Sequence, residues 1–371
     1  MSPTRITHLI AGAEWDGTAE RTSPVYNPAT GEQTGVLDLA TPQLVDEVVR
    51  GAKVAWENEW QHSTLTKRTQ ILFKFRELLN ERKDEIAELI TAEHGKVTSD
   101  ALGEVMRGLE VAEFACGISH LLKGGYSENV STGVDVFSIR QSLGVVGIIS
   151  PFNFPAMVPL WFVPIAIACG NAVVIKPSEK DPSAVNAVAK LWQEAGLPEG
   201  VMNVVHGDKE AVDALLEHDD VKAISFVGST PIAKYVYETA TANGKRVQAL
   251  GGAKNHMLVL PDADLDLAAD AAINAGFGSA GERCMAISAL VAVGDVADPL
   301  VAKIQERMAG LRTGDGRRGC DMGPLVTEAH RDKVRSYVDA GEAAGATIVV
   351  DVLDPEVDGE PGGYWLGPTL I

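Results

Sequence analysis

The alternation of apolar and helical segments between residues 145 and 240 constrains the fold more than any other feature of this sequence. Apolar runs recur at Val145–Ile149, Ala172–Ile175, Val201–Val205 and Ala223–Val227, and helical patterns separate them at Pro159–Ala168, Ser183–Ala195 and Glu210–Glu217. A continuously apolar run is typical of a strand that is buried on both faces. Strands that alternate with helices at this spacing predict right-handed βαβ units, and therefore an α/β fold built on a parallel sheet.

Polar or glycine-containing segments follow three of these strands, at the positions where ligands of parallel sheets bind. They are Ser150–Pro155 after the first strand, Lys176–Lys180 after the second and Val227–Pro231 after the fourth. In the last segment, Gly228 and Ser229 precede a helical pattern, where free backbone N–H groups favour an anion. The plain alternative is that Ser229 only caps that helix.

The flanking segments predict further elements. Residues 1–40 read as short strands with turns, and Gly124–Leu143 reads as an extended hairpin. Three helices are expected between them: one from Pro42 that stops between Trp56 and Trp60, one long helix over Thr66–Glu93 that ends at Gly95, and one that Ser99 or Asp100 caps.

A glycine-rich stretch, Gly276–Met285, presents Cys284 directly after Arg283. An ordinary thiol is only about a few per cent thiolate at neutral pH, and an adjacent guanidinium or helix N-terminus raises that fraction. Cys284 is therefore a candidate nucleophile, and the alternative is a buried structural cysteine. The stretch also matches G-x-G-x-x-G, but a helical pattern precedes it, so we do not interpret it as a dinucleotide-binding loop.

Length, charge and cysteine content bound the class of protein. The 371 residues suggest two or more domains, and the net charge of −19 argues against nucleic acid or an anionic membrane as a partner. The four cysteines lie far apart without metal-binding spacing, which suits a reducing cytosol and predicts no metal site. No signal-peptide pattern opens the sequence, and no apolar run approaches the roughly 20 residues that span a bilayer, so we expect a cytoplasmic protein.

Five segments occur in the order and at the spacing of one known family. They are Pro151-Phe-Asn-Phe-Pro155, Lys176-Pro-Ser-Glu179, Phe226-Val-Gly-Ser229, Leu250-Gly-Gly252 and Gly281-Glu-Arg-Cys284. With these motifs the chain resembles the aldehyde dehydrogenase superfamily over essentially its whole length. The resemblance implies a Rossmann-like NAD-binding domain (1–123 and 143–251), an oligomerisation hairpin (124–142) and a catalytic domain (252–371). It also implies that the C-terminal part of the catalytic domain is missing, because family members continue further.

The resemblance also implies roles for individual residues. Cys284 would be the nucleophile, and the side-chain amide of Asn153 would bind the oxyanion. Residues that would hold NAD are Ser150, Phe152, Lys176, Glu179, Lys180, Gly228, Ser229 and Gly251. Lys176 and Glu179 would hold the adenosine ribose, and Gly228–Ser229 the pyrophosphate. A glutamate at 179 suits ribose hydroxyls and repels a 2′-phosphate, which favours NAD over NADP.

Two further features resemble the CoA-acylating methylmalonate-semialdehyde dehydrogenases. Hydrolytic members carry a glutamate base before the Leu-Gly-Gly motif, where this sequence has Ala249, and residues 281–286 read Gly-Glu-Arg-Cys-Met-Ala. In that group, two arginines that match Arg107 and Arg283 are associated with the substrate carboxylate, for which a guanidinium is a natural bidentate partner. Arg107 also lies between two glutamates in a predicted helix, and the alternative there is a surface ion pair.

The resemblance therefore implies NAD-dependent oxidation of methylmalonate semialdehyde and malonate semialdehyde to propanoyl-CoA and acetyl-CoA. CO2 is lost and coenzyme A accepts the acyl group. A homo-oligomer, dimer or tetramer, is expected. Two alternatives stay open at this point: a hydrolytic aldehyde dehydrogenase that uses another base, and a non-catalytic nucleotide-binding protein.

Overall fold

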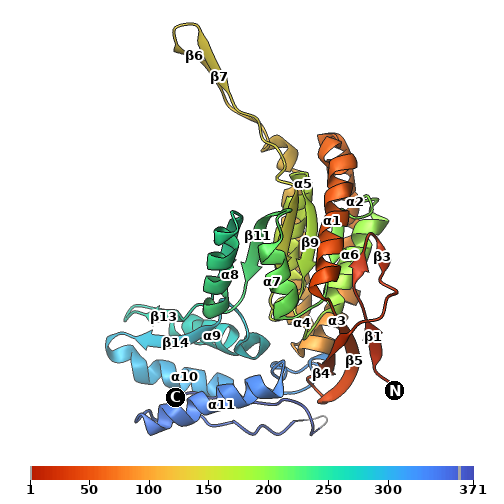
Figure 1. Cartoon of the computed structure of the whole chain (residues 1–371). Coiled ribbons are helices and arrows are strands. Elements are labelled where there is room, and N and C mark those ends of the chain that lie inside the picture. Colours follow the sequence, from red (N-terminus) through yellow and green to blue (C-terminus); the bar gives the residue numbers. More distant parts are fainter. Residues whose placement is uncertain (1, 358–360) are drawn as a thin grey trace.

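The computed structural model describes residues 2–357 and 361–371 and is built around a seven-stranded sheet (Figure 1). In spatial order its strands are β12 (Arg246–Leu250), β11 (Val221–Val227), β8 (Val145–Ile149), β9 (Ala172–Lys176), β10 (Met202–Val204), β2 (Leu9–Ile10) and β3 (Ala13–Glu14). The strands from β12 to β10 are parallel, and β2 and β3 add antiparallel pairs at one edge. The predicted parallel α/β sheet is confirmed, and β12 extends it beyond the strands that the sequence indicated.

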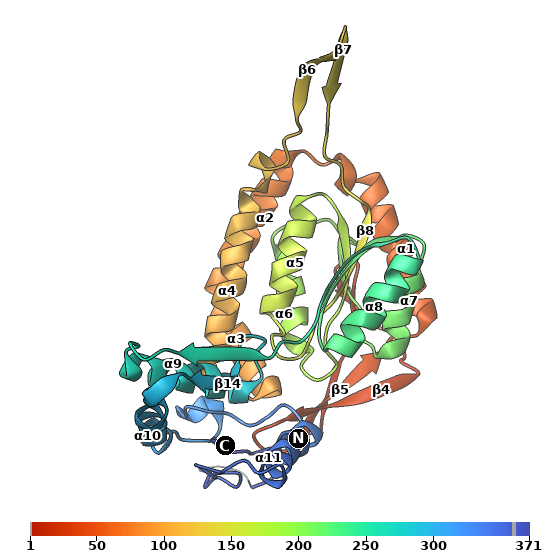
Figure 2. The same cartoon turned by 90° about the vertical axis from the view of Figure 1, so that its left-hand side faces the viewer.

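Helices cover both faces of this sheet (Figure 2). One layer contains α1 (Pro42–Asn58), α7 (Lys209–Glu217) and α8 (Thr230–Ala242), and the other contains α2 (Leu65–Glu81), α3 (Lys83–His94), α4 (Thr98–Cys116), α5 (Met157–Ala168) and α6 (Ser183–Glu194). Alternate residues of β8 enter the two cores, Val145 and Ile149 on the α1 side and Val146 and Ile148 on the α5 side. This two-sided burial explains why the strands read as continuous apolar runs.

The segment that was expected to form one helix over Thr66–Glu93 forms two, and this prediction was wrong. The break lies at Arg82, whose φ of −112° and ψ of 17° leave the helical region. No glycine or proline marks it in the sequence; Arg82 instead pairs with Glu85 of α3 and Glu194 of α6, and the second is a tertiary contact that periodicity does not reveal. Helix α3 ends at Gly95 with a left-handed φ of 91°, as predicted.

The start of α4 also differs from the prediction. The helix begins at Thr98 with Val97 in the N-cap position, so neither Ser99 nor Asp100 caps it. Asp100 lies in the first turn, and its carboxylate accepts hydrogen bonds from a distant segment of the chain instead.

The predicted strands and hairpin outside the main sheet are confirmed. A three-stranded sheet contains β1 (Thr4–Ile6), β5 (Glu32–Leu39) and β4 (Arg21–Asn27), and the hairpin contains β6 (Tyr126–Ser131) and β7 (Val134–Phe137). The hairpin projects from one end of the molecule (Figure 1), and every residue of its two strands is exposed. Among the described residues, none of the helices combines the length and apolar composition needed to cross a bilayer.

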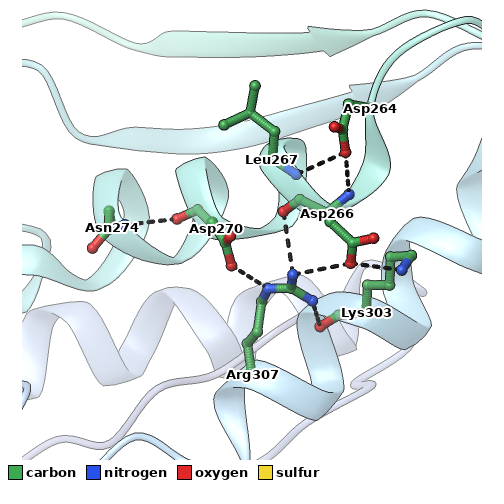
Figure 3. Close-up of polar contacts among 7 residues, drawn as sticks. All are labelled: Asp264, Asp266, Leu267, Asp270, Asn274, Lys303 and Arg307. Carbon is green, nitrogen blue, oxygen red and sulfur yellow. Dashed lines mark hydrogen bonds and ion pairs between the residues drawn. The ribbon is translucent and has the colours of Figure 1, made fainter.

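The chain after residue 252 forms a smaller layer. The parallel strands β13 (Asn255–Val259) and β14 (Ile287–Ala292) share a core with α9 (Leu265–Phe277) and α10 (Ala297–Met308), and α11 (Glu328–Ala343) follows. Figure 3 shows Arg307 of α10 between Asp266 and Asp270 of α9, and Lys303 lies 2.6 Å from Asp266. These contacts fix α9, whose last turn leads into the segment that carries Cys284.

Candidate active site

The carboxyl ends of the five parallel strands meet at one edge of the main sheet, where a cavity of about 870 Å³ opens. Segments that line it follow β8, β9, β10, β11 and β12, and the segment Gly281–Cys284 after α9 also lines it. The predicted strand-end segments are therefore brought together, because parallel strands direct their carboxyl ends to the same edge.

All of the predicted site residues except Arg107 line this cavity. They are Ser150, Phe152, Asn153, Lys176, Glu179, Lys180, Gly228, Ser229, Gly251, Arg283 and Cys284. Arg107 lies on α4 with 71% of its side chain exposed, and its guanidinium is 3.9 Å from Glu110. Within the part of the chain that the structure describes, the cavity wall does not include Arg107, and its placement matches the surface ion pair that the sequence left as an alternative.

Cys284 is exposed at the cavity wall, so the alternative of a buried structural cysteine is wrong. The other three cysteines differ: Cys116 is buried, and Cys169 and Cys320 are half-buried. Burial raises the pKa of each of these three thiols above its ordinary value. Among the four cysteines, Cys284 is thus the one that is placed to act as a nucleophile.

A short turn with unusual backbone geometry precedes Cys284. Three consecutive residues are left-handed, with φ of 50° at Ser279, 52° at Ala280 and 75° at Gly281. A left-handed backbone costs roughly 1–2 kcal/mol for a residue other than glycine. Asp100 of α4 offsets part of this cost, because its Oδ2 accepts hydrogen bonds from Ser279 N at 2.9 Å and Ser279 Oγ at 3.1 Å.

The guanidinium of Arg283 contacts α4 and the end of α9. Its Nη2 lies 2.6 Å from Asp100 Oδ1, and its Nε donates to Ser279 Oγ at 3.3 Å. Its Nη1 donates to the backbone oxygen of Asn274 in the last turn of α9 at 3.4 Å. Since Asp100 neutralises the guanidinium, Arg283 raises the positive potential at Cys284 less than its neighbouring position in the sequence suggested.

A buried ion pair supports the segment that carries Asn153. Lys96 Nζ lies 2.7 Å from Glu104 Oε2 and donates to the backbone oxygen of Asn153, also at 2.7 Å. Glu104 Oε1 accepts from the backbone N–H groups of Ala156 and Met157 at 2.8 and 3.0 Å. The pair thus fixes the backbone on both sides of Phe154–Pro155. No sequence motif pointed to Lys96 or Glu104, because only the fold places them against this segment.

The part of the cavity wall that follows β8 and β9 contains polar groups that fit a dinucleotide. Lys176 is buried, and its Nζ donates to Gly207 O at 3.1 Å and lies 3.5 Å from Glu179 Oε2. Burial lowers the pKa of Lys176, and the carboxylate of Glu179 opposes that shift. Ser150 Oγ is buried at the cavity wall without a hydrogen-bond partner in residues 2–357 and 361–371, so a ligand hydroxyl or phosphate would satisfy it.

Ser229 takes the N-cap position of α8, but its side chain does not form the capping hydrogen bond. Ser229 and Ile232 line the cavity at the start of this helix. In the described part of the chain, the side-chain hydroxyl and the backbone N–H groups of Thr230 and Ile232 therefore remain available to an anion, which favours that interpretation over a plain cap.

Glu282 is a buried carboxylate of the nucleophile segment that the sequence did not single out. Its Oε1 lies 2.7 Å from Nδ1 of His330 on α11, and its Oε2 lies 3.7 Å from Nε2 of His94. Burial lowers the pKa of His94 well below its usual range, so this ring is neutral at neutral pH. The Phe152 ring stacks on His94 at 6.0 Å, and Lys180 Nζ lies 4.7 Å from the centre of the same Phe152 ring.

Comparison with known proteins agrees with this geometry. Residues 15–371 match the model of the aldehyde dehydrogenase family. This chain belongs to that family. It is accordingly an oxidoreductase with the aldehyde dehydrogenase fold. The family resemblance that the sequence motifs indicated is confirmed.

Two curated relatives show the extent of the match. The malonate-semialdehyde dehydrogenase of Pseudomonas aeruginosa is 52% identical over 366 residues, which cover 98% of this chain and 73% of that protein. The malonate-semialdehyde dehydrogenase 3 of Geobacillus kaustophilus is 48% identical over 374 residues, which cover 100% of this chain and 77% of that protein. The chain thus spans about three-quarters of the length of these relatives.

Solved structures of the family are also similar. The methylmalonate-semialdehyde dehydrogenase of Oceanimonas doudoroffii superposes with a TM-score of 0.96 at 53% identity, over 99% of this chain and 75% of that one. A structure from Sinorhizobium meliloti 1021, assigned as a methylmalonate-semialdehyde dehydrogenase and complexed with NAD, gives a TM-score of 0.97 at 48% identity, over 100% and 76% of the two chains.

Proposed function

We propose that this enzyme oxidises malonate semialdehyde and methylmalonate semialdehyde with NAD and transfers the acyl group to coenzyme A. The observation that supports this proposal is Ala249, which occupies the position where hydrolytic members have a glutamate base. Ala249 pairs with Phe226 in the sheet and packs against an apolar core, so this position offers no carboxylate to activate water. Glu282, the buried carboxylate of the nucleophile segment, has His330 Nδ1 2.7 Å from its Oε1, and its Oε2 has no hydrogen-bond partner in the described part of the chain. The position that holds the base in hydrolytic members has no acid–base group, which favours a thiol as the acyl acceptor.

The substrate class rests on the relatives and on Arg283. Relatives named for malonate semialdehyde and methylmalonate semialdehyde support a substrate with a distal carboxylate. A guanidinium has five N–H donors, and the described contacts of Arg283 use three of them, so two remain for that carboxylate. Arg107, about two helical turns from Asp100 on the same face of α4, is proposed as a second donor once its side chain turns away from Glu110.

In this proposal Cys284 Sγ bonds to the aldehyde carbon, and the oxyanion that forms is stabilised by the Asn153 side-chain amide and a backbone N–H. Ser150, Phe152, Lys176, Glu179, Lys180, Gly228, Ser229 and Gly251 would hold NAD. When bound, the nicotinamide supplies the acceptor for the hydride that leaves the substrate carbon. Cys284 then carries the acyl group as a thioester.

The thioester explains the later steps of the proposal. When the C–C bond to the distal carboxylate breaks, its electron pair enters the thioester carbonyl as an enolate and CO2 leaves. A proton then returns to the carbon. The thiol of coenzyme A attacks the thioester, forms the acyl-CoA and releases the Cys284 thiolate. Arg283 would hold the carboxylate until this bond breaks.

The domain roles are part of the same proposal. Residues 1–123 and 143–251 would bind NAD, and residues 252–371 would carry the catalytic cysteine. The hairpin at 124–142 would pair with another copy of the chain in a dimer or tetramer. Its exposed apolar side chains, which include Tyr126, Val136 and Phe137, support an interface there.

The test is NADH formation from malonate semialdehyde with and without coenzyme A. Without it we expect a burst close to one equivalent per active site and then slow turnover, and with it steady turnover that yields acetyl-CoA. Ala249→Glu should raise turnover without coenzyme A, whereas Gln248→Glu, which adds a carboxylate at the neighbouring exposed position, should not. Fast turnover of the wild type without coenzyme A, with free acid as product, would assign a hydrolytic enzyme instead.

A further inference from the structure

We propose that Asp100 is a positioning residue for the nucleophile, which holds the left-handed turn at Ser279–Gly281 in the conformation that presents Cys284 to the cavity. The inference rests on the proposed function in one respect, the role of Cys284 as nucleophile. Nothing in the sequence motifs pointed to Asp100 except a capping role, which the structure does not support.

Asp100 is well placed to act as a fixed anchor. Its helix neighbours Ala101 and Val105 are fully buried in the main core, so α4 does not move easily at this point. The carboxylate itself is 23% exposed and accepts from Ser279 N and Ser279 Oγ with one oxygen, while the other oxygen faces Arg283 Nη2 at 2.6 Å. One side chain thus binds the chain on both sides of Ala280.

The turn needs such an anchor because two of its three left-handed residues carry a Cβ. Ser279 and Ala280 adopt φ of 50° and 52°, whereas only Gly281 accepts a positive φ without steric cost. If the carboxylate is removed, the favoured response is a return of Ser279 and Ala280 to negative φ. That change reorients the chain four residues before the thiol, and a displacement of about 1 Å at a reacting atom can cost on the order of 100-fold in rate.

A residue that positions the nucleophile and a residue that only orients Arg283 have different effects on activity when they are removed. A displaced nucleophile slows every aldehyde equally, whereas a misplaced guanidinium slows only substrates that carry a carboxylate. Propanal and malonate semialdehyde therefore separate the two roles. A glycine at position 280 should also compensate, since it removes one of the two Cβ atoms that oppose the turn.

The experiment compares Asp100→Ala, Asp100→Asn and the double variant Asp100→Ala/Ala280→Gly with wild type. Glu113→Ala is the matched control, because Glu113 is on the same helix and pairs with Arg76 at the surface. We expect Asp100→Ala to lower kcat between about 10- and 100-fold for both aldehydes. Asp100→Asn should lose less of its kcat, because its amide oxygen still accepts from Ser279 N–H. In the double variant, Ala280→Gly should restore at least half of the loss in log kcat. Glu113→Ala should have the same kcat as wild type.

A crystal structure of Asp100→Ala gives a readout that needs no turnover, and we expect negative φ at Ser279 and Ala280. Unchanged positive φ at both residues, an absence of rescue by Ala280→Gly, or a loss confined to malonate semialdehyde would each overturn the inference. Failure of the proposed function would show differently, as a wild type that ignores coenzyme A or the semialdehyde, and the backbone of the variant would still decide the role of Asp100.

Discussion

Lys96 Nζ and Glu104 Oε2 lie 2.7 Å apart with both side chains fully buried, directly behind the backbone of Asn153. A buried ion pair often contributes little net stability, because desolvation of the two charges offsets their attraction. Removal of one partner is different, since it leaves a buried charge without compensation. The pair therefore links the stability of the protein to the geometry of the Asn153 segment, which we propose binds the oxyanion.

The first prediction concerns this pair. Lys96→Met should lower the free energy of unfolding by roughly 3–5 kcal/mol, because Glu104 is left as an unpaired buried charge. The double variant Lys96→Met/Glu104→Gln should recover part of that loss. Urea unfolding of both variants measures the free energy of unfolding. The control is Arg76→Met, which breaks an exposed pair and should stay within about 1 kcal/mol of wild type. Equal effects for Lys96→Met and Arg76→Met would contradict the assignment.

The second prediction concerns the nucleophile. Cys284→Ala should abolish NADH formation with any aldehyde but leave NAD binding intact, because the thiol forms the covalent bond and contributes little to cofactor affinity. Titration of the protein's fluorescence with NAD measures cofactor binding, and a turnover assay measures NADH formation. Cys169→Ala and Cys320→Ala, at half-buried thiols away from the cavity, should keep activity. Residual turnover in purified Cys284→Ala would remove this residue from the mechanism.

The third prediction concerns recognition of the substrate carboxylate. Arg283→Gln should lower kcat/KM for malonate semialdehyde by roughly 2–5 kcal/mol, or about thirtyfold to several-thousandfold, because the buried carboxylate loses its partner. The kcat/KM for propanal should fall much less. Arg107→Gln should act in the same direction if its side chain turns toward the substrate. Arg50→Gln, at an exposed pair with Asp46, serves as the control. Equal losses for the two aldehydes in Arg107→Gln would leave Arg107 as a surface residue.

The fourth prediction is a pH dependence of stability. Burial raises the pKa of Glu93 from its ordinary value of 4.5 to about 7, although hydrogen bonds from Ser183 oppose the shift. The unfolded chain therefore ionises at this residue from about pH 4.5 while the folded chain stays protonated. The free energy of unfolding should fall by roughly 3 kcal/mol as the pH rises from 4.5 to 7, and then level off.

Glu93→Gln isolates this contribution, since the amide preserves the shape of the side chain but does not titrate. In urea unfolding measurements, the stability of the variant relative to wild type should increase as the pH rises from 5 to 8, because only the wild type loses this contribution. Burial also raises the pKa of the neighbouring Asp181, so a slope in the same direction should persist in the variant. If variant and wild type differ in stability by the same amount at pH 5 and at pH 8, Glu93 ionises normally in the fold.

Local sequence determined most of the architecture. The apolar runs and the helical periods between them were sufficient to predict β8, β9, β10 and β11 and the helices that separate them, because a buried parallel strand is a short continuous apolar run whereas an amphipathic helix repeats its apolar residues every 3.6 positions. The strand ends then identified the residues that line the cavity, since every carboxyl end of a parallel sheet lies at the same edge. Five ordered motifs were sufficient to indicate the family.

Tertiary structure decided the rest. The break at Arg82 has no local signal in the sequence, and the roles of Lys96, Glu104 and Asp100 follow from the packing of their part of the chain against segments far away in sequence. Arg107, which the resemblance linked to Arg283, lies at the surface beside Glu110. Sequence alone specifies elements whose signal is local in period and composition; ion pairs and hydrogen bonds between distant segments depend on how those elements pack, and only the folded chain brings such partners within a few ångströms.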